Sequence, residues 1–180
     1  MRLLLHTCCA PCVLSVRKAF LERGFEVVGF FFNPNIHPYL EYRRRMEALK
    51  SYAGREGFPV VYADDYDLEG FLRRVVHNES ERCRLCYGVR LEETAKTASE
   101  QGFDCFSSTL LVSPHQKHDV VRRAGEAAGA QWGVAFCYVD FRPAWRAAMN
   151  EAQRRRMYLQ QYCGCVYSEK ERYFRKPKGG

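Results

Sequence analysis

Short apolar runs alternate with longer amphipathic segments along this chain, and the alternation restricts the possible folds more than any other feature. The apolar runs cover residues 2–6, 26–32, 59–62, 103–107 and 133–139. Helical periodicity covers residues 11–23, 38–56, 67–77, 84–101, 115–129, 143–159 and 165–174. Strands that alternate with helices form parallel sheets, because each crossover helix packs back on the sheet. We therefore expect an α/β three-layer sandwich with a mainly parallel, Rossmann-like sheet of about five strands and helices on both faces.

The chain length and the lack of a linker predict one domain. The chain has 180 residues, enough to bury a core. We expect residues 1–176 to form a single α/β domain with the C-terminal helices packed on it, and 177–180 to form a flexible basic tail. No apolar run is long enough to cross a membrane, and His6 and Pro11 interrupt the only stretch that resembles a signal peptide. We expect a cytoplasmic protein without a membrane partner.

The charge favours a polyanionic partner. The chain has 28 Lys and Arg against 21 Asp and Glu, for a net charge of +7, and 21 of the 28 basic residues are Arg. Arg binds phosphate with two parallel hydrogen bonds, which suits nucleic acid, although a solubilising surface explains the charge equally well. The runs 43–45 and 154–156, each of three Arg, are candidates for RNA contact, but solvated helix faces are the more usual explanation.

The nine cysteines indicate metal or redox chemistry. In a reducing compartment a disulfide scaffold is rare, so cysteines grouped in motifs point to metal binding or catalysis. Cys105 and Cys137 fall inside predicted strands, and we expect both in the core. The other seven form three motifs: HTCCAPC with Cys8, Cys9 and Cys12, CRLC with Cys83 and Cys86, and YCGC with Cys163 and Cys165.

The first two motifs predict a metal centre. Cys8 and Cys9 follow the first strand and precede a helix, where backbone N–H groups favour thiolates; burial as small hydrophobic residues is the alternative. The CxxC of Cys83 and Cys86 alone fits a redox dithiol, a zinc half-site or a cluster half-site. Together the two pairs supply four thiolates, which suit zinc or a [4Fe–4S] cluster. The spare thiols nearby favour the cluster, because structural zinc sites are usually closed.

Cys163 and Cys165 are separated only by Gly164, so they can close a small, strained disulfide. Strained disulfides tend to be catalytic rather than structural. Further metal ligands or free thiols are the alternatives.

Two polar loops are candidate binding sites for a base and a ribose. Turn formation explains some of their residues equally well, and helix capping explains others. The predicted substrate-binding residues are Asn33, Asn35 and Tyr39 in the first loop and Ser107, Ser108, His115 and Gln116 in the second.

In combination, these motifs resemble QueH-type epoxyqueuosine reductases, the cobalamin-independent enzymes of queuosine biosynthesis. The resemblance rests on LLHTCCAPC, FFFNPNIHPYLEYRRR, ERCRLCYGVRL, SSTLLVSPHQKHD, and QQYCGC with the following YSEKERY. It implies an oxidoreductase that deoxygenates epoxyqueuosine to queuosine at the wobble position of tRNA. The partners would be that tRNA and an unidentified electron donor.

The resemblance also implies a cofactor and roles for the cysteines. It implies a redox-active pair at Cys163 and Cys165, and it allows an additional mononuclear iron with Cys12 as a candidate ligand. Deoxygenation needs two electrons, and a cluster delivers one at a time, so an adjacent iron or the dithiol would be a useful second store. The [4Fe–4S] ligands would be Cys8, Cys9, Cys83 and Cys86. The leaving oxygen needs a proton, for which His6, His115 and Tyr39 are the candidate donors, although a structural hydrogen bond explains each of them at least as well.

Three other functions compete with this one. An ATP-dependent tRNA sulfur transferase would need a glycine-rich phosphate loop after the first strand, where this chain has HTCCAPC instead. An iron–sulfur thiol–disulfide reductase acting on a protein partner and a zinc-based, non-catalytic RNA-binding module are the others. The sequence does not indicate an oligomeric state.

Overall fold

The protein forms a parallel sheet with helices on both faces, as the sequence predicts. The computed structural model describes residues 1–63 and 66–174, so the predicted tail at 177–180 lies outside the described residues. Five parallel strands lie in the order β3-β2-β1-β4-β5. Their bounds are Arg2–His6 for β1, Glu26–Phe31 for β2, Val60–Tyr62 for β3, Cys105–Ser108 for β4 and Ala135–Phe136 for β5.

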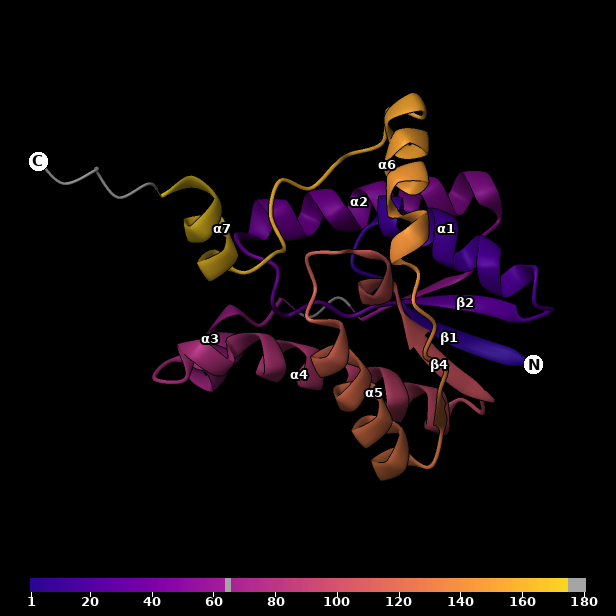
Figure 1. Ribbon diagram of the computed structural model, residues 1–180, viewed down its shortest axis with the longest axis horizontal. Helices are drawn as coiled ribbons and strands as arrows, with labels where there is room; N and C mark the ends of the chain where they lie inside the picture. The colour runs from indigo at the N-terminus through magenta and orange to yellow at the C-terminus, as the bar shows by residue number, and fades with distance from the viewer. Residues whose placement is uncertain (64–65, 175–180) are drawn as a thin grey trace, which may run out of the picture.

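The helices divide between the two faces according to the direction of the crossovers (Figure 1). From β1 the chain moves toward β2 and β3, which places α1 (Ala10–Leu21) and α2 (Tyr39–Glu56) on one face. From β4 it moves the other way, so α5 (His118–Trp132) covers the opposite face with α4 (Arg82–Glu100). The remaining helices are α3 (Leu68–Val75), α6 (Trp145–Arg154), which packs on α1, and α7 (Val166–Tyr173).

The centre of the core is β1. Leu3, Leu4 and Leu5 have no solvent exposure, because β1 is paired on both edges and covered on both faces. This explains why its sequence is a continuous apolar run rather than an alternating one. Since β1 leads into α1 on one face and β4 into α5 on the other, their carboxyl ends form the topological switch point of the sheet.

Some predicted boundaries were wrong where the chain makes tertiary contacts. The edge strand β5 covers only Ala135–Phe136, and Cys137 beyond it is half-buried, whereas Cys105 is buried as predicted. The helix expected to reach residue 159 ends at Arg154, and the following segment crosses to α2, where the Tyr158 hydroxyl donates a hydrogen bond to Glu41. None of the helices within the described ranges is long and apolar enough to span a membrane.

Candidate active site

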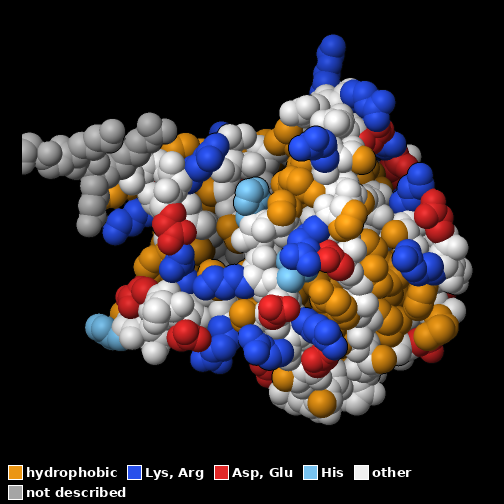
Figure 2. All heavy atoms as spheres, viewed as in Figure 1, with side chains coloured by type: hydrophobic (Ala, Val, Ile, Leu, Met, Phe, Trp, Pro, Cys, Tyr) orange, Lys and Arg blue, Asp and Glu red, His pale blue; other side chains and the backbone are white. Residues whose placement is uncertain are grey.

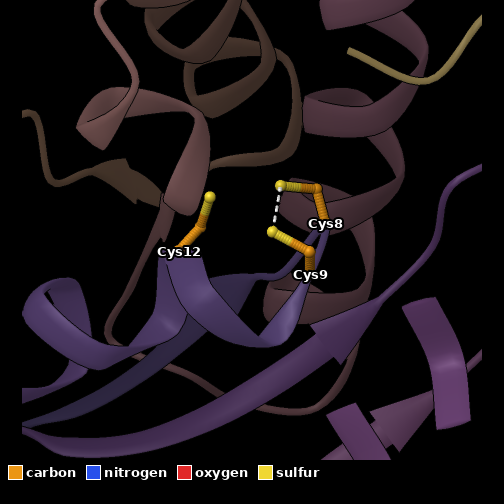
Figure 3. A group of neighbouring side chains, drawn as sticks. All are labelled: Cys8, Cys9 and Cys12. Atoms are coloured by element: carbon orange, nitrogen blue, oxygen red, sulfur yellow. Dashed lines mark hydrogen bonds between the residues drawn. The ribbon is translucent and has the colours of Figure 1, made fainter. Parts of the chain in front are cut away.

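Three cysteine sulfurs converge just beyond the carboxyl end of β1 (Figure 3). The Sγ atoms of Cys8, Cys9 and Cys12 all lie within 4.8 Å of one another, and those of Cys8 and Cys9 are 3.8 Å apart. Cys8 and Cys9 lie in the loop before α1, and Cys12 lies in the first turn of that helix, so its side chain points back toward the loop. All three residues are buried. The group therefore lies at the switch point, where sheets of this kind bind ligands.

Among these three thiols, Cys8 is the one prepared to ionise. Hydrogen bonds from Cys12 and Cys9 lower the pKa of Cys8 well below its usual value, and Arg90 and Thr109 act in the same direction. Together they outweigh burial, which alone would raise it. A thiolate beside two further thiols is a soft donor set that suits zinc or iron–sulfur centres.

A buried guanidinium connects this loop to the second cysteine motif. The Arg90 side chain in α4 is 1% exposed, and its Nη1 donates to Cys86 Sγ at 3.5 Å. Its Nε donates to His6 Nε2 at 3.3 Å and its Nη2 to Asn33 Oδ1 at 3.2 Å. Burial alone would lower the pKa of Arg90, but the negative charge that Cys86 and Cys8 carry when ionised outweighs burial and raises that pKa. Because a buried cation is stable only among anionic or polar partners, Arg90 favours charged thiolates in both motifs.

Cys83 and Cys86 lie within the first two turns of α4, which begins at Arg82, two residues before the predicted start. Cys86 is buried and Cys83 half-buried, and burial raises the pKa of Cys86 to about 12, despite the nearby Arg90. In the part of the chain that the structure describes, the three sulfurs close enough to share one ion do not include either of these. A single centre with four cysteine ligands therefore stays a prediction.

The third motif is fixed to α2 by a buried ion pair. Arg45 has no solvent exposure, and its Nε donates to Glu41 Oε1 at 2.7 Å. Its other two nitrogens donate to the backbone carbonyls of Cys163 at 2.8 Å and Tyr162 at 2.9 Å. Both interpretations of the Arg43–Arg45 run, an RNA contact or a solvated face, are therefore wrong for Arg45. Its role is to hold the loop that carries Cys163.

Close backbone contact explains why a glycine separates the two cysteines. The Gly164 carbonyl accepts a hydrogen bond from the His37 N–H at 2.8 Å. A Cβ atom on Gly164 would come within 3.2 Å of Asn35 and Ile36, and φ there is +152°, so a larger residue would be strained. The loop is thus clamped against residues 35–37.

Cys163 and Cys165 are free thiols in this structure. Cys163 is exposed, and its Sγ accepts a hydrogen bond from Gln116 Nε2 at 3.4 Å. Cys165 is half-buried, and it packs in the same small apolar cluster as Cys86 and Phe71. The third motif therefore contacts the second, and one thiol of the pair faces solvent.

Breaking the buried pair should destabilise the protein more than breaking an exposed pair on the same helix. Replacing Arg45 with Met leaves the Glu41 carboxylate buried without its cation, and we expect a loss of about 3 kcal/mol in the free energy of unfolding. The matched control is Arg43→Met, since Arg43 makes an exposed pair with Glu47 at 3.4 Å. That control should cost less than about 1 kcal/mol. Chemical denaturation of both variants measures the difference, and equal losses would contradict the role given to Arg45.

Three of the predicted substrate-binding residues already have partners inside the protein. Ser108 Oγ contacts His6 Nδ1 at 2.9 Å and caps the short helix Thr109–Val112, and Ser107 Oγ donates to the Cys137 carbonyl at 2.8 Å. Asn33 Nδ2 donates to the Thr7 carbonyl at 2.9 Å. Ser107, Ser108 and Asn33 have no solvent exposure, so the capping and structural explanations account for them.

The other predicted residues differ in their access to solvent. Asn35 is buried, and Gln116 is half-buried beside Cys163. Tyr39 and His115 are exposed. Of the candidate proton donors, His6 is fully buried, and burial followed by Arg90 lowers its pKa to about 3, so its imidazole is neutral near pH 7.

The sequence interpretation missed Arg90 and Arg45, the two buried cations around the cysteines. For Arg90 a signal existed, because it follows Cys86 by four residues on one helix and therefore lies on the same helical face. For Arg45 there was no comparable signal, since the Arg-rich run around it is typical of an exposed surface.

The fold and the site define a Rossmann-like α/β protein with a cysteine-based centre at the switch point of its sheet. Residues 3–171 match the family model described as Epoxyqueuosine reductase QueH. Curated proteins with this name are 41% identical in Dehalococcoides mccartyi, covering 96% of this chain and 94% of the relative, and 34% identical in Thermotoga maritima, covering 94% and 91%. A third, from Haemophilus influenzae, is 36% identical and covers 93% and 71%. The chain therefore belongs to the epoxyqueuosine reductase QueH family of oxidoreductases, which confirms the resemblance in the motifs.

Proposed function

We propose that this chain reduces epoxyqueuosine to queuosine at the wobble position of tRNA in the cytoplasm. The observation that carries the proposal is the convergence of the Cys8, Cys9 and Cys12 sulfurs at the switch point of a QueH-family chain. Removing the epoxide oxygen as water consumes two electrons and two protons. A site for this reaction needs electron-donating groups beside the substrate, and cysteines are the groups that this site offers.

We propose that Cys8, Cys9, Cys83 and Cys86 hold a [4Fe–4S] cluster and that Cys12 is a ligand of an additional mononuclear iron. The donor chemistry supports this: the Cys8, Cys9 and Cys12 sulfurs lie within 4.8 Å of one another, the pKa of Cys8 is lowered, and Arg90 contacts Cys86. When bound, the cluster would supply electrons one at a time. Arg90 would offset the negative charge of the thiolates, and burial of Cys8, Cys9 and Cys86 would exclude water.

The dithiol of Cys163 and Cys165 could supply the electrons and protons that the reaction needs. Oxidising the two thiols to one disulfide releases two electrons and two protons, the number that the deoxygenation consumes. The exposure of Cys163 supports contact with substrate, and the packing of Cys165 beside Cys86 supports electron exchange with the metal centre. An external electron donor would then return the disulfide to the dithiol.

The proposed substrate is a polyanion, so its binding should weaken steeply as salt rises. On the face drawn in Figure 2, Lys and Arg side chains lie over α3, α4 and α5, with acidic side chains between them. Neutralising several phosphates releases counterions, and we expect the affinity for tRNA to fall by roughly tenfold or more between 50 and 200 mM salt. Filter binding or fluorescence anisotropy measures this. Binding of a neutral nucleoside is the control, and its affinity should not change with salt. If the affinity for tRNA does not change with salt either, the positive charge serves solubility only.

Anaerobic purification followed by a turnover assay tests the proposed function. The protein should show the visible absorption of an iron–sulfur centre, and with a chemical reductant it should convert epoxyqueuosine in tRNA into a nucleoside lighter by one oxygen, detected by mass spectrometry. Stoichiometric zinc without iron, together with tRNA binding but no conversion, would favour a non-catalytic RNA-binding module instead. Reduction of protein disulfides without conversion would favour a thiol–disulfide reductase.

A further inference from the structure

A cavity of about 400 Å³ opens beside Cys163, large enough for a small molecule or a single nucleotide base. Its walls come from the loop before α5, the start of α6, the segment before α7 and α7 itself. The lining includes His115, Gln116, Trp145, Gln160, Gln161 and Cys163.

We propose that this cavity receives a nucleobase extruded from an RNA loop, with its ring stacked on Trp145 and its edge bound by glutamine amides. The inference rests on the proposed function and adds to it the place where the modified base binds. Enzymes that act on a base in RNA or DNA must take it out of its stack, and they hold it between aromatic groups and hydrogen-bonding side chains.

The aromatic wall is the first supporting observation. Trp145 is half-buried at the start of α6, and the exposed His115 ring meets it edge-on, with centroids 6.1 Å apart and planes at 89°. The two rings are at right angles, so a flat ligand that stacks on Trp145 lies perpendicular to the His115 ring. Stacking on aromatic side chains is the sequence-tolerant way in which proteins bind unpaired bases.

The amides are the second observation. Gln116 is fixed in place, because its Oε1 accepts from the Tyr87 hydroxyl at 2.8 Å and its Nε2 donates to Cys163 Sγ at 3.4 Å. Gln160 Oε1 is buried and lacks a hydrogen-bond partner within the described part of the chain. An unpaired buried acceptor is costly, and a turn of the Gln160 side chain into the cavity would let an N–H on the edge of a base satisfy it.

The position of the cavity links binding to chemistry. Cys163 lies on its wall, so a base held against Trp145 would lie beside the exposed thiol of the redox pair. A groove of about 500 Å³ between α4 and α5 differs in kind, because within the described ranges its lining includes Gly88, Ala124 and Ala128 but neither a cysteine nor an aromatic side chain. The chemistry of the lining therefore favours the cavity beside Cys163.

Substitution of Trp145 tests the stacking. With the iron-loaded enzyme and an anticodon stem–loop carrying epoxyqueuosine, Trp145→Ala should raise KM by roughly tenfold or more with a smaller effect on kcat, and Trp145→Phe should recover most of the loss. Trp132→Ala is the matched control, because Trp132 packs beside Lys96 outside the cavity, and it should leave KM unchanged. An unchanged KM in Trp145→Ala would overturn the proposal.

Protection of Cys163 gives a readout that does not require turnover. Guanosine or the anticodon stem–loop should slow the alkylation of Cys163 by iodoacetamide, measured by peptide mass spectrometry, and Trp145→Ala should abolish that protection. Equal alkylation rates with and without RNA would overturn the cavity assignment, whatever the turnover. Protection without any conversion of epoxyqueuosine would support the cavity while contradicting the proposed reaction, so the two failures are distinguishable.

Discussion

Replacing Cys8 with Ser should remove most of the bound iron and reduce epoxyqueuosine turnover to background. Of the three close thiols, Cys8 is the one whose pKa is lowered, through hydrogen bonds from Cys12 and Cys9 and the charge of Arg90. A serine hydroxyl stays protonated and is a hard oxygen donor, so it replaces a thiolate poorly as an iron ligand. We expect iron content to fall by roughly tenfold. Removing only a hydrogen-bond partner of a ligand typically lowers metal affinity by about 10–100-fold, and removing the ligand itself also removes its bond to the metal.

The control for this variant is Cys137→Ser. Cys137 is half-buried beyond β5 and is not a member of the close sulfur group, so its substitution should leave iron content and turnover near those of the unmodified protein. Iron assays and visible spectra of the two anaerobic preparations give the comparison. Full iron content in Cys8→Ser would contradict a metal centre at the end of β1.

Replacing both Cys163 and Cys165 with Ser should keep the iron and abolish most turnover, by roughly a hundredfold or more. The loop is held through backbone groups, since Arg45 contacts the carbonyls of Cys163 and Tyr162 and His37 contacts that of Gly164. Exchanging sulfur for oxygen in the side chains leaves these contacts intact. The variant therefore removes the redox chemistry of the pair without removing the loop.

Iron content and turnover must be measured separately in this variant. Loss of iron together with activity would identify the two cysteines as metal ligands. Turnover at the unmodified rate with a physiological reductant would make them bystanders. Alkylation of the reduced and oxidised protein gives an independent measurement, because a reversible disulfide protects both thiols only in the oxidised form.

Local sequence was sufficient to predict the architecture. The run at residues 2–6 coincides with β1, and the helix expected at 38–56 differs from α2 by one residue, because continuous burial and a 3.6-residue period leave strong local signatures. The end of α2 at Gly57, where φ is +56°, is likewise a local property of glycine. Boundaries were missed where local signals are weak, as in β5, which pairs with a neighbour on one edge only.

By itself, the sequence determined the sheet, the three cysteine motifs and the end of the sheet to which the first belongs. Tertiary structure alone decided which sulfurs converge, that Ser107 and Ser108 are buried, and that two arginines are fully enclosed. The Arg90 contact with His6 spans 84 residues and the Arg45 contact with Cys163 spans 118. The periodicity of a segment indicates only whether that helix or strand has a buried face. The two arginine contacts depend instead on the order of the strands and on the path of the C-terminal segment across α2. The charge that surrounds the cysteines is therefore a property of the assembled fold.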